Sequence, residues 1–179
     1  MGLLIFNELK LPVLTNRMKG PVYEKFKKTI LALMFTQRLD VFESESSRDG
    51  PWERLSTTTA KRRLKKIPKK KRKKGFKILQ DDGTLRQSMT VDGDLHQQTN
   101  LQDDTVSLTS NVEYAAIHNF GGTIKHPGTK NGFGKGIKIP AHKINIPARP
   151  FDQFTDTHIE EHKELAQSYL DEPTGAFGG

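Results

Sequence analysis

The chain lacks cysteine and has no long apolar run, and each absence narrows what it can do. With no cysteine among its 179 residues, disulfide bonds and thiolate chemistry are excluded, which fits a protein made in a reducing cytoplasm. No apolar run approaches the ~20 residues that a membrane-spanning helix needs. The segment Leu3–Phe6 is apolar but short, with no basic region before it and no small-residue cleavage site after it. We therefore expect neither a membrane span nor export.

Hydrophobic residues are also scarce, at 34% of the chain. A chain of this length and composition forms one domain with a modest core and leaves some segments outside it. We predict an N-terminal arm at residues 1–19, a single domain at residues 20–171 and a disordered tail at residues 172–179. The apolar arm packs either on its own domain or on a neighbouring subunit, and both interpretations stay open.

Acidic residues are absent from residues 61–77, a basic insertion with twelve Lys or Arg. The rest of the chain has seventeen basic and twenty-one acidic residues, a net charge of −4 against +8 for the whole. Such a block repels itself and is expected to be extended unless it meets a polyanion or an acidic surface. Its centre, Pro68–Lys74, resembles a nuclear localisation signal. Without interleaved aromatic residues, sequence-specific reading of nucleic acid is not expected.

Three interpretations of this basic insertion stay open. It contacts a phosphate backbone non-specifically, it contacts an acidic protein, or it is a solvated loop. The residues expected to make such contacts are Lys65, Lys66, Lys69, Lys70, Lys71, Arg72, Lys73 and Lys74.

Two longer helices are predicted near the ends of the domain. Gly20-Pro21 is a typical helix start, and Val22, Phe26, Thr29 or Ile30, and Leu33 form a buried stripe in a helix that runs to about Phe42. The stretch 30–35 is apolar all round, which indicates that both of its faces are covered and hints at oligomerisation. The second helix starts near Thr157, where Thr157 and Glu160 form a capping box, and it ends before Pro173.

Short strands are predicted between these helices. Met89 with Val91, and Val106 with Leu108, alternate with polar residues and predict two half-buried strands in an antiparallel hairpin. Two further short strands, at Ile137/Ile139 and Ile144/Ile146, meet at a turn around Pro140-Ala141. The preceding glycine-rich stretch, 123–136, is predicted to be a mobile loop that orders on assembly. Trp52, after a Gly-Pro turn, is predicted to be a core anchor.

The chain is organised around the stretch Tyr114–Gly122 and an answering segment, Ile146–Phe151. The first predicts a short helix that ends at Gly121, where a left-handed conformation is available. The second has prolines on both sides of Ala148-Arg149, so it is extended, stiff and not a central strand. We expect Phe120 and Phe151 to enter one core.

Patterns typical of catalytic, cofactor and metal sites fail when their spacing is tested. His158 and His162 match the H-x-x-E-H pattern of zinc proteases, but no third ligand is apparent, so no metal is expected. Gly134-Lys135 could belong to a phosphate-binding loop only if residue 129 were glycine and residue 136 serine or threonine. These positions hold Thr129 and Gly136, so the pattern does not match. His118 is interpreted as a partner of a helix C-terminus. We predict no enzymatic activity and no cofactor.

Four segments in order carry a resemblance to a known family. They are Asp49–Trp52 with Leu55; Lys77–Asp81 with Gly83, Leu85-Arg86 and Ser88; Tyr114–Gly122; and Ile146–Phe151. Together they resemble the phage virion morphogenesis family, which includes the Mu-type morphogenesis protein and tail-completion proteins of contractile-tailed phages. The resemblance covers roughly residues 20–170. The residues that carry it are Trp52, Leu79, Leu85, Tyr114, Ile117, His118, Phe120, Gly121, Gly122, Pro147, Arg149, Pro150 and Phe151.

The resemblance implies an α+β fold, a small antiparallel sheet packed with a long N-terminal helix, a short central helix and a C-terminal helix. It implies a structural protein of the virion neck or tail end, present in the host cytoplasm during assembly. There it would form a hexameric ring that completes the tail and allows heads and tails to join. Its partners would be other copies and neighbouring neck, connector, tail-tube or terminator proteins, with non-specific contact to packaged DNA.

Several alternatives remain beside tail completion. Within the same class, the chain is a tail terminator or a head–tail connector ring. In a different class, it is a non-specific nucleic-acid-binding module that acts through the basic insertion, or a metallohydrolase built on His158 and His162.

Overall fold

The body of the molecule is built along one helix, α1 (Pro21–Ser44). The structure, a computed structural model, describes residues 5–10, 18, 20–69, 75–102, 104–132 and 136–171. Pro21 occupies the first turn of α1, and Glu45 ends the helix in a left-handed conformation with its N–H bonded to the carbonyl of Val41. The predicted start is confirmed. The buried stripe is only partly as predicted, because Phe26 and Ile30 are fully buried whereas Val22 and Leu33 are only half-buried.

A three-stranded antiparallel sheet covers one side of α1. Its order is β1 (Ile5–Lys10), β5 (Thr105–Ser110), β4 (Gln97–Asn100), and Ser110 of β5 is the register partner of both Ile5 and Gln97. Val106 and Leu108 of the central strand are fully buried, as their alternation predicts. Part of the predicted N-terminal arm is therefore β1, paired within its own chain. Residues 1–4, 11–17 and 19 of that arm, and the predicted tail at 172–179, lie outside the described residues.

The second strand predicted for this hairpin is instead a helix, α3 (Thr84–Thr90). Leu85, Ser88 and Met89 are its buried residues, and their spacing of three and four is that of a helix face. Val91 lies beyond the helix and is 48% exposed. The strand that pairs with β5 is β4, which lies in the polar stretch predicted to be a connection. The prediction was wrong because β4 is a polar edge strand, without the apolar alternation that marks a half-buried one.

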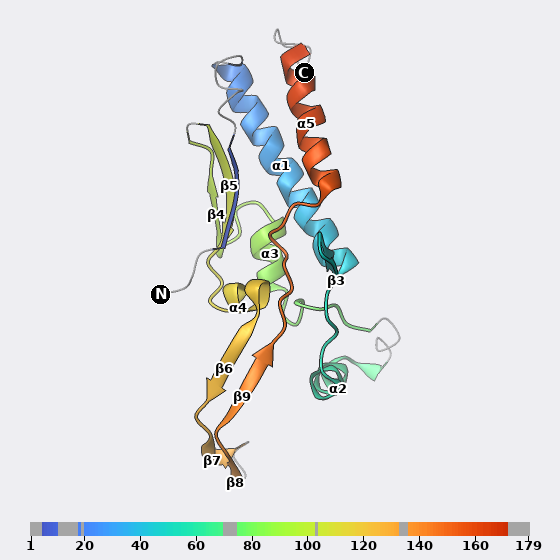
Figure 1. Ribbon diagram of the computed structural model, residues 1–179, viewed down its shortest axis with the longest axis vertical. Helices are drawn as coiled ribbons and strands as arrows, with labels where there is room; N and C mark the ends of the chain where they lie inside the picture. The colour runs from blue at the N-terminus through green and yellow to red at the C-terminus, as the bar shows by residue number, and fades with distance from the viewer. Residues whose placement is uncertain are drawn as a thin grey trace.

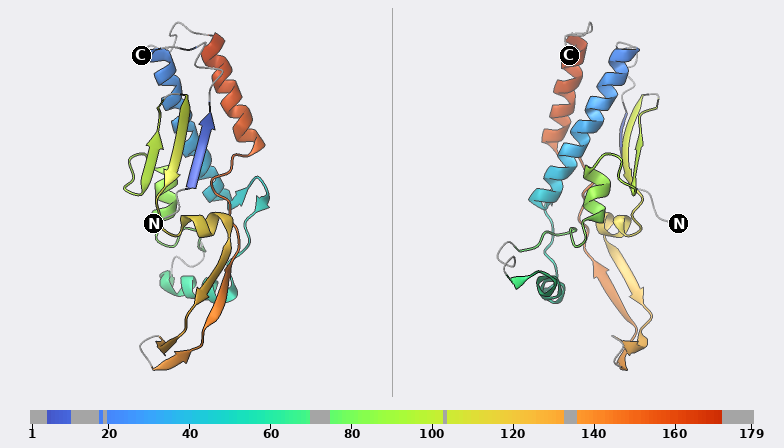
Figure 2. Two further views of the ribbon diagram at one scale, coloured as in Figure 1. Left: turned by 60° about the vertical axis from the view of Figure 1, so that its left-hand side comes forward. Right: turned by 180° about the vertical axis from the view of Figure 1, so that it is seen from behind.

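The other side of α1 carries α5 (Asp156–Asp171), so α1 lies between the sheet and α5 (Figures 1 and 2). Phe26 and Tyr169 meet edge to face at 5.3 Å between ring centroids, and the Tyr169 hydroxyl lies 3.0 Å from that of Thr29. The predicted capping box is wrong by two residues. The Thr155 hydroxyl accepts the N–H of His158 at 3.2 Å, and Nδ1 of His158 accepts the N–H of Thr155 at 3.3 Å. The predicted α+β class is confirmed.

Small elements complete the chain. They are β2 (Ser46–Ser47) paired with β3 (Gly50–Pro51), α2 (Thr57–Lys66), α4 (Ala115–Phe120), and the strands β6 (Gly122–His126), β7 (Thr129–Gly132), β8 (Ile137–Ile139) and β9 (His142–Ile146). The last four strands form a ribbon that extends away from the body, and α2 lies beside it at the same end of the molecule (Figures 1 and 2).

Arg38 of α1 is a fully buried charge that joins α1 to the segment leading into α5. Its Nη1 donates to the carbonyls of Phe151 at 3.0 Å and Gln153 at 2.6 Å. The guanidinium stacks on the ring of Phe154, 4.4 Å from the centroid. Burial lowers the pKa of Arg38 to about 10, so it stays charged at neutral pH. The sequence pattern did not single out this residue, because an arginine in an amphipathic helix usually marks the solvent face.

Replacing Arg38 with alanine is expected to lower the free energy of unfolding by about 3 kcal/mol, because two buried carbonyls lose their donor and a cavity forms. Arg48→Ala is the matched control, since Arg48 is 56% exposed and forms a surface ion pair with Asp156 at 3.0 Å. Such a pair contributes at most about 1 kcal/mol. Urea unfolding of both variants measures the difference. Equal losses would show that the buried guanidinium has no special role.

Candidate functional site

Three of the sequence motifs meet where the ribbon leaves the body. The indole N–H of Trp52 donates to the carbonyl of Pro150 at 3.2 Å. The backbone N–H of Arg149 donates to the carbonyl of His118 at 2.8 Å, and its Nε donates to the carbonyl of Glu53 at 3.0 Å. Segments far apart in the sequence are thus held together mainly by bonds to backbone carbonyls. We call this place the junction, formed by residues 49–55, 114–122 and 146–151.

An aromatic cluster forms the core of the junction. Phe42 lies 5.8 Å from Trp52 and 5.6 Å from Phe151, measured between ring centroids. Trp52 and Phe151 are buried, as predicted. Phe120 is 63% exposed, so its predicted place in the core is wrong. The helix α4 turns Ala115 and Asn119 toward the core, and the next residue points elsewhere because successive side chains on a helix are about 100° apart.

Two successive glycines allow the chain to turn from α4 into the ribbon. Gly121 has φ +71°, and a Cβ there would lie 2.8 Å from the backbone nitrogen of Ala148. Gly122 has φ +152°, and a Cβ there would lie 2.7 Å from Cδ1 of Ile117. The predicted helix end at Gly121 is confirmed. The close approach to the backbone of Ala148 explains why residue 121 is glycine and not asparagine or aspartate, which also adopt positive φ values.

The ribbon has two antiparallel sections. Strand β6 pairs with β9, from Gly122 opposite Ile146 to His126 opposite His142, and farther out β7 pairs with β8. The two predicted strands at 137–139 and 144–146 are confirmed, but they pair with the glycine-rich stretch and not with each other. The predicted mobile loop is wrong for residues 123–126 and 129–132, which are in strands, while residues 133–135 lie outside the described residues. Cross-strand pairing, invisible to local propensity, orders this stretch.

The ribbon buries little of its own surface. Ile124, Ile137 and Ile144 are 44%, 50% and 37% exposed, and every described residue of β6 and β9 is exposed or half-buried. A two-stranded ribbon without a covering layer is marginally stable in water. Exposed isoleucines on such an element are typical of a surface that a partner covers.

Charge is strongly segregated toward the ribbon end. Residues 122–146 hold five lysines and no acidic residue. With residues 61–77 they carry seventeen basic residues, and the rest of the chain keeps twelve basic against twenty-one acidic, a net charge of −9. Among the described residues, the cations of α2 and of the ribbon lie at one end of the molecule, since α2 lies beside the ribbon (Figure 1).

The basic insertion was predicted to be extended. That prediction is wrong for its first residues, which are helical up to Lys66. Ser56 caps this helix by accepting the N–H of Thr59 at 3.3 Å. Arg63 and Lys66 both reach Asp81, at 3.8 Å and 2.8 Å, which reduces the self-repulsion of the block. Lys65, Lys66 and Lys69 are exposed, and Lys70, Lys71, Arg72, Lys73 and Lys74 lie outside the described residues.

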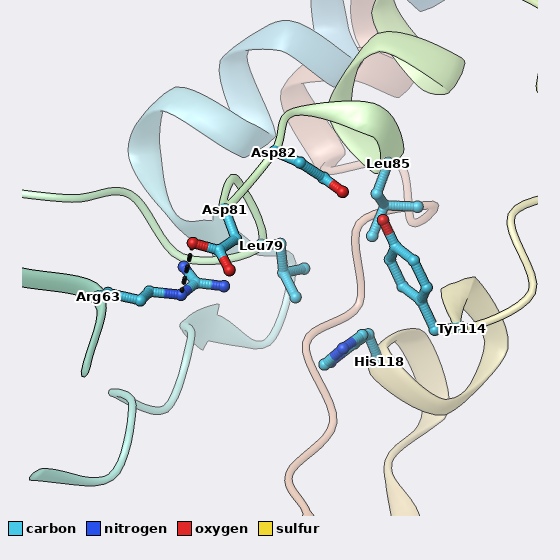
Figure 3. Close-up of a pocket in the computed structure, with 7 residues that line it drawn as sticks. All are labelled: Arg63, Leu79, Asp81, Asp82, Leu85, Tyr114 and His118. Carbon is cyan, nitrogen blue, oxygen red and sulfur yellow. Dashed lines mark ion pairs between the residues drawn. The ribbon is translucent and has the colours of Figure 1, made fainter. Parts of the chain in front are cut away.

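A cavity of about 240 Å³ separates α2 from α4 beside the junction (Figure 3). The residues lining it are Arg63, Leu79, Asp81, Asp82, Leu85, Tyr114 and His118. The hydrogen bond from Lys66 holds the pKa of Asp81 below its usual range. Burial raises the pKa of Tyr114 and lowers that of His118. His118 lies in the last turn of α4, the position predicted for a partner of the helix C-terminus. Its lowered pKa weakens that role, because the helix dipole favours the charged imidazole.

The cavity does not combine its groups into a catalytic arrangement. Of its two carboxylates, Asp81 is already engaged by two cations and Asp82 accepts the N–H of Thr84 at 3.1 Å. The lining residues include no serine, threonine or lysine beside His118. The cavity is best understood as the space between motif segments that the junction holds together.

The two histidines of α5 do not form a metal site with other described residues. Both are buried, and Nδ1 of His158 is used in the helix cap. Within the described part of the chain, no group of three His, Cys, Asp or Glu is placed to hold a metal ion. His162 instead packs edge to face on Phe154 at 4.9 Å.

Comparison with known proteins places these features in a family. The model of the phage virion morphogenesis family matches residues 32–171, which is most of the chain and includes the junction and the whole ribbon. The chain belongs to the phage virion morphogenesis family. No curated protein and no solved structure matches it.

Membership of the phage virion morphogenesis family gives the chain a structural role in virion morphogenesis. In the described parts of the chain, no helix is both long and apolar enough to cross a membrane. The residues that carry the family resemblance lie mainly at the junction and the adjacent cavity. In this member of the family they position a projecting element, the ribbon.

The close approach at Gly121 predicts a specific loss on substitution. Gly121→Ala is expected to destabilise the protein by about 3 kcal/mol, because it adds a clash with backbone to an unfavourable φ. Gly93→Ala is the matched control, since Gly93 has φ +76° and nothing within 4 Å of an added Cβ. It should cost only about 1 kcal/mol. Thermal or urea unfolding measures both, and similar losses would contradict the packing at the junction.

Burial of His162 predicts a pH-dependent stability. Burial, then the nearby His158 and Arg38, lower the pKa of His162 to about 4, against about 6.5 in the unfolded chain. Between these values the unfolded state holds more protons, so the free energy of unfolding falls as pH falls, by up to about 1.4 kcal/mol per pH unit for this histidine. Urea unfolding between pH 7 and 4.5 should show a smaller slope for His162→Gln. An unchanged slope for His162→Gln would show that the buried imidazole is not the group responsible.

Proposed function

We propose that the chain is a tail-completion protein of a contractile-tailed phage. In this proposal it forms a ring, a hexamer, at the neck or tail end of the virion and allows filled heads to join finished tails. The observation that carries the proposal is the projecting ribbon, an apolar and basic element without a core of its own in a member of a virion morphogenesis family. Such an element is expected to gain its cover from neighbouring subunits.

Ring assembly is consistent with the unequal ends of the molecule. A cyclic ring joins one surface of each subunit to a different surface of the next. The ribbon end is basic, whereas the remainder of the chain is acidic, so a head-to-tail contact between copies brings opposite charges together. The exposed lysines of α2 would then face packaged DNA or an acidic face of the neighbouring ring, and either contact weakens as salt rises.

A tail terminator and a head–tail connector ring remain the alternatives within the same class, because each would be a ring in the region where the head meets the tail. The different-class alternative is a non-specific nucleic-acid-binding module. It is favoured by one observation, the seventeen basic residues concentrated in two segments of the sequence. Phosphate contacts of that kind need no sequence recognition.

Electron microscopy of a lysate from phage lacking this protein tests the proposal. Tail completion predicts separate DNA-filled heads and separate tails of normal length. Adding the purified protein should then restore joining and infectivity, and adding Gly121→Ala protein at a temperature where it is unfolded should not. Tails of abnormal length would support the terminator alternative. Intact infectious particles would contradict a structural role and favour nucleic-acid binding.

A further inference from the structure

The helices α1 and α5 leave a groove on the face that the sheet does not cover. Its volume is about 520 Å³, and its lining includes Ala32, Leu33 and Thr36 from α1 and Glu161, Glu164 and Leu165 from α5. Ala32 and Glu164 are exposed, and Leu33 and Leu165 are half-buried. The groove therefore has an apolar floor with carboxylates beside it.

This groove accounts for an unexplained feature of the sequence, the stretch 30–35 that is apolar all round. Ile30, Leu31 and Met34 face the core of the body and are buried. Ala32 and Leu33 line the groove, and no other described residue forms an apolar layer over them. The second covered face that the sequence predicts is thus the groove, and its cover is not among the described residues.

The ribbon has one apolar face that suits such a groove. Ile124 and Ile144 are register partners and lie on the same face as the stacked rings of His126 and His142, 4.9 Å apart. Thr123 donates to Asn145 at 2.9 Å on the opposite face. The apolar face is therefore continuous across both strands and is exposed in the single chain.

The charges of the ribbon and of α5 favour the pairing of these two elements. Helix α5 has five acidic residues and one lysine, whereas residues 122–146 have five lysines and no acid. Among the described residues, no ion pair engages Glu164, and Glu161 accepts a hydrogen bond only from the neutral amide of Gln37, at 2.7 Å. Opposite net charges on the two elements favour their association and direct it.

We propose that the apolar face of the ribbon in one copy packs into the α1/α5 groove of the next copy, and that the opposite net charges of the ribbon and α5 steer the two surfaces together. The two surfaces lie at opposite ends of the molecule (Figure 1), so one chain cannot join them within itself. The contact is heterologous and repeats from copy to copy. This inference rests on the proposed ring and names the surfaces that build it.

Disulfide trapping tests the contact directly, because the natural chain has no cysteine. The double variant Ile144→Cys with Ala32→Cys should form covalent oligomers under mild oxidation, up to the full assembly. The control double variant Ile144→Cys with Gln98→Cys places the second thiol on β4, far from the groove, and should stay monomeric under denaturing electrophoresis. Each single variant should give at most a dimer.

Charge reversal supplies an independent readout that does not depend on thiols. Lys125 and Lys143 are register partners on the ribbon face opposite Ile124 and Ile144. Lys125→Glu with Lys143→Glu therefore reverses the charge of the ribbon, leaves its apolar face unchanged, and should weaken self-association about tenfold or more in sedimentation equilibrium. Adding Glu164→Lys to that variant should recover part of the loss. Unchanged circular dichroism and unfolding of the variants would show that the body stays folded.

The outcomes separate this inference from the proposed function. Native assemblies that form without Ile144–Ala32 crosslinks would overturn the ribbon-in-groove contact, while restored head–tail joining would still support tail completion. Ile144→Cys that is protected only by added heads, tails or DNA would also overturn it, by assigning the ribbon to another partner. Crosslinked oligomers without any joining activity would support the contact and contradict the function.

Discussion

The buried guanidinium of Arg38 is the interaction on which the arrangement of this protein depends. It holds the carbonyls of Phe151 and Gln153 against α1, and so fixes the extended strap that enters α5 on one side and the ribbon on the other. Trp52 adds a third hydrogen bond to the same strap, at Pro150. A buried charge is costly unless it finds acceptors, and here the strap supplies two of them to Nη1. The path of the strap, and with it the position of the ribbon, is therefore tied to one cation in the core of the body.

The molecule divides into a part that carries its own core and a part that does not. The body buries Phe26, Ile30, Met34 and Leu108 between its layers, whereas the ribbon exposes Ile124 and Ile144. Burial of apolar area is the main source of stability. The ribbon therefore has little stability of its own and would gain stability if a partner covered its isoleucines. The same division holds for charge, with lysines on the ribbon and carboxylates on α5. In the proposed ring, these complementary surfaces are the ones that bring neighbouring copies together.

Much of the body could be predicted from local patterns, and much of the junction could not. The start of α1 at Pro21, the end of α4 at Gly121 and the buried strand at 105–110 follow from rules that involve only neighbouring residues. The strand expected around Met89 was wrong because two apolar residues fit both a period of two and the helix α3. The strands β4, β6 and β7 were missed because their side chains are polar or exposed, so only pairing with a distant strand defines them.

The sequence by itself therefore determined the features that depend on adjacent residues or on amino-acid composition. It determined the helix limits set by proline and glycine, the stiffness of residues 146–151, the absence of thiol chemistry, and the concentration of positive charge in two segments. The tertiary structure alone decided which residues are buried. It placed Phe120 in solvent and Phe151 in the core, moved the cap of α5 to Thr155 and His158, and buried Arg38 with His162. The physical reason is that burial, hydrogen-bond acceptors and strand partners are supplied by residues distant in the chain, and local periodicity carries no record of them.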